Sequence, residues 1–463
     1  MSKNDPNDIC LLNFLIGPVF TGHQKPQTIN KMKRRHFLKS TGLGLMGYPL
    51  MSNACTKAIT NSIAASDKIR VAHIGTGSMG SAHIGWFAGF PDVETVALCD
   101  VDQTHLVNAQ KRLASVNSLA KPDTYTDFRY IMDRKDIDVV TCATPDHWHA
   151  LIALMAFESG KNVYGEKPLS YSVEEGKVML QSLKRYKRIF QLGTQIHAGE
   201  NYHRVSEIIQ SGILGKIHTV RLWKKGGSPG LGFPKNEEPP KTLDWNMWLG
   251  PAPYSEYTPV RCHRSFRYFS DYSGGVFADF WCHIADIMYM SLYPTGLYSI
   301  DARGELPTDG IADTPKWIDV DFKFKDLNVF WTTTPPPEVE GSAEMHIGAH
   351  FEGEKGTLTC DYETQRIKIG NQVMNDVQEV PVTLTRSPGH QRNFLDSVKS
   401  RKEPESNIEY ARDMTLPMHL ALISFRLKRK LKWDSAKDQF ANDLEANSLL
   451  SREYRKPWSL PVI

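Results

Sequence analysis

The sequence lacks the features that mark several large classes of protein. Among its 463 residues there is no run of roughly 18 or more uncharged apolar residues, so we expect no membrane-spanning helix. Its seven cysteines are scattered, without CxxC pairs or zinc-type spacing, so we expect no disulfide framework. It also lacks a basic block, because the formal net charge of +3 arises in residues 1–66 and the rest of the chain is weakly acidic. Nucleic acid is therefore not an expected partner.

Length and composition describe a globular protein of more than one domain. Apolar residues make up 41% of the chain and charged residues 23%, which is typical of a folded protein with ample core. A chain of 463 residues has room for two or three domains. Cys99 and Cys142 fall within predicted buried strands, where cysteine behaves as a small apolar residue.

A short basic motif precedes a weakly apolar, Gly-rich stretch near the start of the chain. The pair Arg34 and Arg35 lies in the segment 33–39, which comes directly before residues 40–50, and this is the arrangement of a twin-arginine export signal. The alternative is the basic end of an amphipathic helix. Twin-arginine export carries folded proteins with their cofactors bound, so the motif predicts a periplasmic protein.

The position of this motif also predicts where the mature protein begins. Export signals start close to the initiator, so we expect Met32 to be the functional start and residues 1–31 to be a non-native extension. Residues 32–66 then form the signal and a linker. Cys55 is a candidate lipid acceptor, although Ser52 stands where lipoprotein signals favour leucine.

A glycine-rich turn follows the first strongly apolar stretch. Residues 69–74 read as a buried parallel strand, and an amphipathic helix is expected after the turn. Between them, Gly75 makes the tight turn, Gly77 lets the backbone approach a pyrophosphate, and Gly80 permits close packing of helix on strand. The pyrophosphate would lie on the positive N-terminus of that helix.

An acidic residue at the end of the next strand indicates which dinucleotide binds. The predicted strand 93–99 ends in Asp100, which lies 20 residues after Gly80. A carboxylate there accepts hydrogen bonds from the ribose hydroxyls and would repel a 2′-phosphate, so NAD is favoured over NADP. An exposed Asp beside an ordinary glycine turn is the alternative.

Strands and helices continue to alternate as far as Gln195. Further strands are expected at 138–143, 162–164 and 189–192, with helices at 127–133, 147–158 and 172–187. This alternation predicts a doubly wound parallel sheet of the Rossmann type over residues 67–195. Ligands of such sheets bind at the carboxyl ends of the strands.

The segments at these strand ends carry a family likeness. The chain resembles the Gfo/Idh/MocA family, the glucose–fructose oxidoreductase and inositol dehydrogenase group, from Ile69 nearly to the C-terminus. The likeness rests on residues 75–80, 143–149, 166–168 and 274–286. It implies that residues 196–463 form an α+β substrate and oligomerisation domain. That domain would have a large, mostly antiparallel open sheet, and its C-terminal helices would pack back.

The resemblance also implies roles for individual residues. Lys167 would contact the nicotinamide ribose and the substrate, Pro168 would follow a cis peptide bond, and Asp279 and His283 would lie over the nicotinamide face. Together with the strand-end argument, it gives the expected NAD-binding residues as Gly75, Thr76, Gly77, Ser78, Met79, Gly80, Asp100, Thr144, Pro145, His149, Glu166, Lys167 and Gln195.

The chemistry of alcohol oxidation supports these roles independently. A histidine can accept the hydroxyl proton near neutral pH while hydride leaves the same carbon. An ammonium nearby stabilises the developing alkoxide and keeps the histidine neutral. Asp279 and His283 are spaced i, i+4, which puts both on one face of a helix. A buried core histidine is the alternative for His283, because aromatic residues surround it in the sequence.

Several other residues are weaker candidates. His147 and His149 are as well explained by helix capping or packing, and the aromatic loop at 244–251 is equally a sugar platform or core. His346 and His350 lie in an apparent strand, where this spacing separates the side chains too far for a metal, so we expect no metal site. Further contacts to sugar hydroxyls, each more readily structural, are Tyr202, His203, Arg264 and Arg267, and Gln195 and His197 face the cleft.

Three functions remain open at this level. The first is an NAD-dependent dehydrogenase acting on a hydroxyl-bearing carbon of a sugar, glycoside or cyclitol, working as a homo-oligomer. The second is a glycosidase of the same fold that oxidises the sugar transiently, eliminates the glycosidic substituent and re-reduces the ring. The third is a non-catalytic, cofactor-bound sugar sensor, which the joint presence of Lys167, Asp279 and His283 disfavours.

Overall fold

The computed structural model describes residues 67–462, and the first of its two sheets is built entirely from parallel strands. Their spatial order is β3-β2-β1-β4-β5-β6, in which β1 lies at the point where the order reverses. The strands are β1 (Ile69–Ile74), β2 (Val93–Cys99), β3 (Asp123–Tyr125), β4 (Val139–Cys142), β5 (Asn162–Gly165) and β6 (Phe190–Leu192).

Helices cover both faces of this sheet because side chains alternate along each strand. In β2, Leu98 packs with Ile84 and Leu106 of α2 and α3, whereas Ala97 faces the cluster that includes Ile152 of α5. The helices are α2 (Ser78–Ala88), α3 (Gln103–Val116), α4 (Arg129–Asp133), α5 (Asp146–Glu158) and α6 (Val173–Tyr186). The predicted doubly wound parallel sheet is confirmed.

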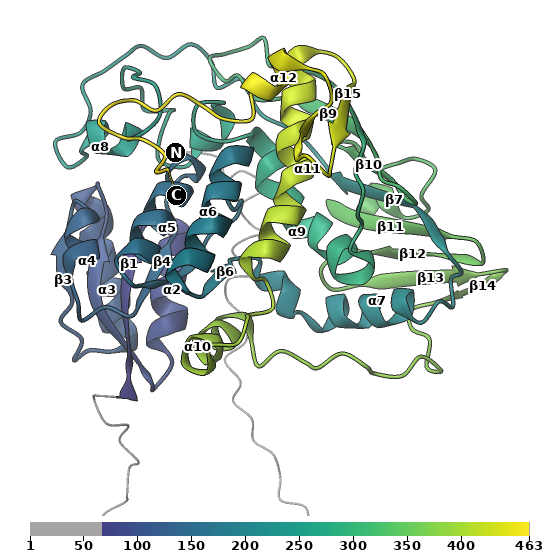
Figure 1. Ribbon diagram of the computed structural model, residues 1–463, viewed down its shortest axis with the longest axis horizontal. Helices are drawn as coiled ribbons and strands as arrows, with labels where there is room; N and C mark the ends of the chain where they lie inside the picture. Colours follow the sequence, from purple (N-terminus) through teal and green to yellow (C-terminus); the bar gives the residue numbers. More distant parts are fainter. Residues whose placement is uncertain (1–66, 463) are drawn as a thin grey trace, which may run out of the picture. The chain divides into compact units, whose positions relative to one another are not determined.

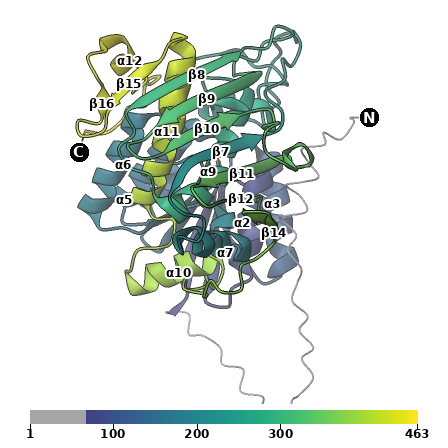
Figure 2. The same ribbon diagram turned by 90° about the vertical axis from the view of Figure 1, so that its right-hand side faces the viewer.

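The second sheet is larger and mostly antiparallel. Its order is β14-β13-β12-β11-β7-β10-β9-β8-β15-β16, and only β7 and β10 pair in parallel among its described strands. Figure 2 shows these strands side by side. They are β7 (Ile217–Lys224), β8 (Ser299–Glu305), β9 (Trp317–Lys323), β10 (Asn328–Thr332), β11 (Ile347–Gly353), β12 (Gly356–Cys360), β13 (Gln365–Ile369), β14 (Gln372–Met374), β15 (Leu431–Asp434) and β16 (Gln439–Phe440).

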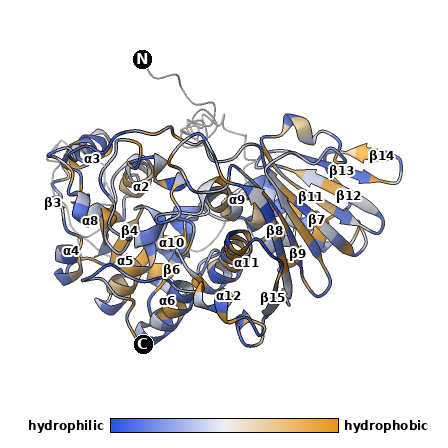
Figure 3. Ribbon diagram, turned by 90° about the horizontal axis from the view of Figure 1, so that it is seen from above, coloured by the Kyte–Doolittle hydropathy of each residue, from blue (hydrophilic) through white to orange (hydrophobic). Residues whose placement is uncertain are grey.

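Two long helices cover one face of this sheet. In β9 every second residue is buried, which is the pattern of a strand with one covered face. Helices α9 (Gly275–Leu292) and α11 (Ile408–Leu427) pack on that face and lie between the two sheets (Figures 1 and 3). The remaining helices are α7 (Glu200–Gln210), α8 (Trp245–Leu249), α10 (His390–Ser400) and α12 (Leu444–Ser448), with short turns η2 (Gln195–Ala198), η3 (Ser265–Tyr268) and η4 (Ser342–Glu344).

The chain returns to the first sheet near its end. Phe394 and Leu395 of α10 are buried in one cluster with Val71 of β1 and Phe87 of α2, and α11 contacts α6 and β6. Buried side chains of both sheets, such as Val140 of β4 and Val220 of β7, belong to one cluster, so the two sheets form one packed unit. Within residues 67–462 no helix is long and apolar enough to cross a membrane.

The structure differs from the sequence-based expectations in several details. The segment at 244–251 is not simply a loop, because residues 245–249 form the short helix α8, capped by the Asp244 side chain on the Met247 amide. Helix α3 and strand β3 were missed, and the three residues of β3 are not buried and carry no apolar pattern.

The two histidines that were expected in one strand are placed differently. His350 lies in β11, where its Nδ1 is 2.8 Å from Thr359 Oγ1, whereas His346 lies in the bend before that strand. The predicted export motif, Met32 and Cys55 lie outside the described residues.

Candidate cofactor and catalytic site

A cavity of about 310 Å³ opens at the carboxyl ends of the parallel strands. One wall comes from the first sheet and the other from α8, η3 and α9. Expected site residues that line it are Gly75, Gly77, Ser78, Met79, Asp100, Thr144, Pro145, Glu166, Lys167 and Asp279, and they are joined by Trp148, Met247, Trp248, Phe266, Arg264 and Arg267.

The glycine loop forms a cradle that side chains would fill. Gly75 has a φ of +76°, and a Cβ on it would lie 2.7 Å from the backbone of Ala143. A Cβ on Gly80 would lie 1.8 Å from the carbonyl oxygen of Gly75, so α2 could not approach β1 as it does. Helix α2 begins at Ser78 with its amides at the cavity, an arrangement that fits the pyrophosphate of a dinucleotide.

Asp100 fastens this loop to the end of β2. Its Oδ2 accepts hydrogen bonds from the Thr76 amide at 2.7 Å and the Thr76 hydroxyl at 3.2 Å, and its Oδ1 accepts one from the Asp102 amide at 3.0 Å. The carboxylate is buried at the cavity wall and retains acceptor capacity on Oδ1. That position and charge fit the ribose hydroxyls of NAD, as the sequence predicts.

Glu166 is held in place by two side chains from different elements. Its Oε1 lies 2.9 Å from His83 Nε2 of α2 and accepts a hydrogen bond of 2.9 Å from Gln195 Nε2 of η2. Burial would raise the pKa of Glu166, but the His83 hydrogen bond and the Lys167 charge lower it below its usual range. Glu166 therefore presents a fixed negative charge beside Lys167.

Lys167, which follows β5, and Asp279 of α9 meet at the cavity wall. Lys167 Nζ donates to the Asp279 carboxylate and, at 2.9 Å, to the Asp279 carbonyl, while Arg267 Nε donates to the other carboxylate oxygen at 3.0 Å. Burial would raise the pKa of Asp279, but the charges of Arg267 and Lys167 hold it well below its usual range. The group is an ionised carboxylate between two cations, and the Lys167–Pro168 peptide bond is cis as the resemblance implied.

His283 lies one turn of α9 beyond Asp279, on the same side of the helix. It is buried and does not line the cavity, and its Nδ1 has no hydrogen-bond partner among the described residues. Burial, aided by the Lys167 charge, lowers the pKa of His283 to about 4. The ring is therefore neutral near pH 7, but no hydrogen bond joins it to Asp279 in the described structure.

The remaining expected site residues lie behind the cavity wall. Gly80 is buried in α2, and Thr76 and Gln195 hold Asp100 and Glu166 as described. His149 lies between two backbone carbonyls, with Nδ1 2.7 Å from that of Pro168 and Nε2 2.9 Å from that of Thr144, so it fastens two strand ends together. These residues shape the cavity without facing it.

The weaker candidates divide in the same way. His147 packs against α8, with Nε2 3.1 Å from the Trp248 carbonyl, and burial lowers its pKa to about 3. Tyr202 is fully buried and donates to the His283 carbonyl at 2.8 Å. Arg264 and Arg267, which the sequence analysis treated as more readily structural, are at the cavity wall.

Four acidic or imidazole side chains of the site were not predicted from the sequence. His83 orients Glu166, and Asp146 lines the cavity with its Oδ2 accepting a 2.5 Å hydrogen bond from Ser273. His105 and His263 face each other beside Asp100 at the cavity wall, with ring centroids 4.1 Å apart. The i, i+5 spacing of Asp100 and His105 was the one available signal, and it is too common to be specific.

Comparison with known families assigns both halves of the chain. A sequence model described as "Oxidoreductase family, NAD-binding Rossmann fold" matches residues 69–194. A second, described as "Oxidoreductase family, C-terminal alpha/beta domain", matches residues 199–460, which is more than half of the chain. Both models belong to the Gfo/Idh/MocA group.

Individual relatives agree with this assignment. A protein of Shewanella pealeana named "Glycosyl hydrolase family 109 protein" is 30% identical over 207 residues, covering 40% of this chain and 44% of that protein. The chain thus matches less than half the length of this curated relative. In fold, it is similar to the WlbA dehydrogenase of Bordetella pertussis, solved with NADH and UDP-GlcNAcA, with a TM-score of 0.58, 18% identity and coverage of 79% and 99% of the two chains. A levoglucosan dehydrogenase solved with NADH and levoglucosan also has a TM-score of 0.58, with 17% identity and coverage of 79% and 99%.

Proposed function

The chain belongs to the Gfo/Idh/MocA oxidoreductase family, and we propose that it is an NAD-dependent dehydrogenase of a sugar, glycoside or cyclitol hydroxyl. The observation that carries this proposal is the ion pair of Lys167 and Asp279 in a cavity that also contains the glycine loop and Asp100. A cation for the reacting oxygen and a cradle for the dinucleotide thus share one space.

Oxidation of an alcohol requires a hydride and a proton to leave the same C–OH group. NAD, when bound, supplies the hydride acceptor. Lys167 is placed to stabilise the alkoxide, because its ammonium lies at the cavity wall and Asp279 holds it there through two hydrogen bonds. Arg267, on the far side of Asp279, keeps that carboxylate ionised and adds positive charge to the same wall.

We assign the hydroxyl proton to His283. Its pKa of about 4 makes it neutral at pH 7, as a general base must be before the reaction. It lies behind the cavity wall, so the proton would reach it through water or a small shift of α9 side chains on substrate binding. Apo geometry of this kind often tightens in the substrate complex.

The other cavity walls suit a carbohydrate. Trp248, Met247 and Phe266 offer apolar surface for the CH faces of a sugar ring, and Trp248 is stacked on Trp245 with ring centroids 4.7 Å apart. Arg267 and Lys167 provide donors for hydroxyl oxygens. The substrates named with the similar solved dehydrogenases, UDP-GlcNAcA and levoglucosan, are of this class.

A net glycosidase is the second candidate, favoured by the names of the curated relatives. In that reaction the oxidised sugar loses its glycosidic substituent by elimination, water adds, and the hydride returns from the cofactor to the ring. Lys167, Asp279 and His283 would serve the oxidation step in both cases. The alternatives differ only in what leaves the site.

One experiment separates these candidates. Protein loaded with NAD is incubated with a panel of sugars, cyclitols and aryl glycosides, and the products are analysed by mass spectrometry. A keto-sugar together with stoichiometric NADH supports the dehydrogenase. Released aglycone with no net NADH supports the glycosidase, and binding without either product would overturn both in favour of a sensor.

We further propose that the protein is exported through Arg34 and Arg35, acts in the periplasm and assembles as a homo-oligomer. Changing both arginines to lysine is expected to retain the protein in the cytoplasm, as measured by fractionation and immunoblotting. Periplasmic protein after that change would contradict the proposal. Lipidation at Cys55 stays a prediction that mass spectrometry of the membrane fraction would test.

A further inference from the structure

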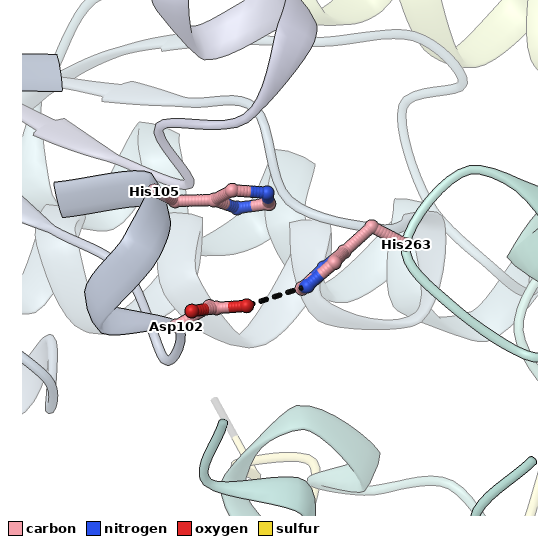
Figure 4. A group of neighbouring side chains, drawn as sticks. All are labelled: Asp102, His105 and His263. Carbon is pink, nitrogen blue, oxygen red and sulfur yellow. Dashed lines mark hydrogen bonds and ion pairs between the residues drawn. The ribbon is translucent and has the colours of Figure 1, made fainter. Parts of the chain in front are cut away.

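Two histidines and an aspartate converge beside Asp100 at the wall of the cofactor cavity. Asp102 and His105 lie at the start of α3, and His263 comes from the segment before η3, 161 residues from Asp102 in the chain. Figure 4 shows the three side chains directed toward one another. One ligand atom from each residue lies within 4.8 Å of those of the other two.

The three side chains have the chemistry of a transition-metal site. Two imidazoles and one carboxylate are the protein ligands of many zinc and iron(II) sites that keep open positions for water. Ligand atoms around one zinc ion lie about 3.4 Å apart, so the group needs a contraction of roughly 1 Å. The exposed fractions of the His105 and His263 side chains, 23% and 35%, leave both rings room for that movement.

Two of the three ligands are each held by a further group in the manner of a metal site. Asp102 Oδ1 caps α3 through a 2.8 Å hydrogen bond from the Thr104 amide, which leaves Oδ2 directed at His263 Nε2, 2.9 Å away. His105 Nδ1 lies 3.3 Å from Asp100 Oδ2, so the carboxylate can accept a hydrogen bond from Nδ1–H. In that tautomer Nε2 keeps a free lone pair for a metal. A carboxylate orients metal-binding histidines in the same way.

The charge and rigidity of the surroundings also favour a cation. Two carboxylates, Asp100 and Asp102, face two imidazoles that carry no formal charge when neutral. The backbone of Asp102 is clamped, because the Gln103 amide donates to the Thr242 carbonyl at 3.0 Å and the Asp244 amide donates to the Val101 carbonyl at 3.0 Å. The aspartate is therefore fixed in place before any ion arrives.

We propose that Asp102, His105 and His263 bind one divalent transition-metal ion, with zinc as the representative. The ion joins α3 of the first sheet to the segment that leads into Phe266 and Arg267, and so holds the substrate-side wall of the cavity in place. The site shares the wall of the cofactor cavity, but its test measures metal binding and does not depend on turnover. It departs from our expectation of no metal, which rested on local cysteine and histidine spacing and could not detect a ligand so distant in sequence.

Metal content and affinity test the proposal on the full-length, NAD-loaded protein. After chelator treatment and desalting, zinc is titrated by calorimetry and its retention is counted by mass spectrometry of the metal. We expect the protein to bind one equivalent of zinc. The zinc affinity should fall about a hundredfold or more in each of the variants His105→Gln, His263→Gln and Asp102→Asn. Asparagine retains the helix cap in the last variant, which protects its fold.

A matched control removes an imidazole that lies outside the group. His218→Gln changes an exposed histidine on β7, and should bind zinc like the wild type. Cobalt(II) in place of zinc should give visible absorption bands that only the three ligand variants lose. Affinity should fall with decreasing pH, because protons compete with the metal for the imidazole nitrogens. Wild type without stoichiometric zinc, or ligand variants that bind as tightly as His218→Gln, would overturn the proposal.

Discussion

Replacing Lys167 by methionine removes the cation that the account places at the reacting oxygen. Methionine keeps the length and apolar stem of the side chain, so the change isolates the ammonium. In the native protein this ammonium donates to both the carboxylate and the carbonyl of Asp279, and the two side chains are only 7% and 13% exposed. Little solvent therefore reaches the pair to take over the role of the ammonium.

The structure separates the effect on turnover from the effect on stability. Loss of one preorganised donor to a developing oxyanion lowers the rate about 10²–10³-fold. Breaking a buried ion pair lowers the free energy of unfolding by about 3–5 kcal/mol. The loss for Lys167→Met should lie near or below the lower end of this range, because Arg267 still neutralises Asp279 at 3.0 Å. Stopped-flow measurement of NADH formation in a single turnover and denaturant unfolding report the two quantities separately.

Lys161 provides a matched control at the other end of the same strand. It precedes β5 as Lys167 follows it, is also buried, and donates to the Met132 carbonyl at 2.9 Å. Lys161→Met should lower stability while leaving the rate of hydride transfer within a few-fold of the wild type. A folded Lys167→Met protein with near-normal turnover, or a Lys161→Met protein equally impaired in turnover, would refute the reasoning.

Three further predictions concern the base and the cofactor cradle. His283→Ala should lower turnover about 10²–10⁴-fold while NAD is retained. Wild-type turnover should be constant near neutral pH and fall toward about pH 4, where His283 becomes protonated. Turnover of His283→Ala at the wild-type rate would exclude His283 as the base. Asp100→Ser should narrow the preference for NAD over NADP in steady-state kinetics, because a charge that repels the 2′-phosphate is lost, and unchanged selectivity would contradict that role. Gly80→Ala should abolish NAD binding in calorimetry, because its Cβ would lie 1.8 Å from the Gly75 carbonyl, whereas Gly89→Ala at the other end of α2 meets nothing closer than 3.4 Å and should bind normally.

The parallel sheet was predictable from the sequence because its signals are local. Strand β1 (Ile69–Ile74) is mostly apolar and comes directly before the glycine turn. The turn needs glycine for steric reasons that hold in any such fold. The same holds for α6, which begins where Ser172 accepts a hydrogen bond from the Glu175 amide. The second sheet was accessible only through the family likeness. Three pairings that hold it together, β7 with β10, β7 with β11 and β8 with β15, join strands far apart in the chain, and no local pattern indicates them.

The parts of the site that were missed depend on tertiary contacts. Nothing near Arg267 indicates that it will meet Asp279, and nothing near His263 indicates Asp102. The motif residues Lys167 and Asp279 were expected in one site and are brought together, whereas the expected base, His283, is buried behind the wall. Spacing i, i+4 puts Asp279 and His283 on one helix face, but the width of that face and the packing against it decide which side chain reaches the cavity.

Transfer of a labelled hydride tests the central claim most directly. Protein loaded with NAD is mixed with sugars, glycosides and cyclitols that carry deuterium on their hydroxyl-bearing carbons. The cofactor is then released in acid and its deuterium content is measured by mass spectrometry. We predict that at least one substrate transfers deuterium to the cofactor in wild-type protein, and that Lys167→Met slows this transfer about 10²–10³-fold. Turnover of a substrate with no deuterium in the cofactor at any time would contradict the account.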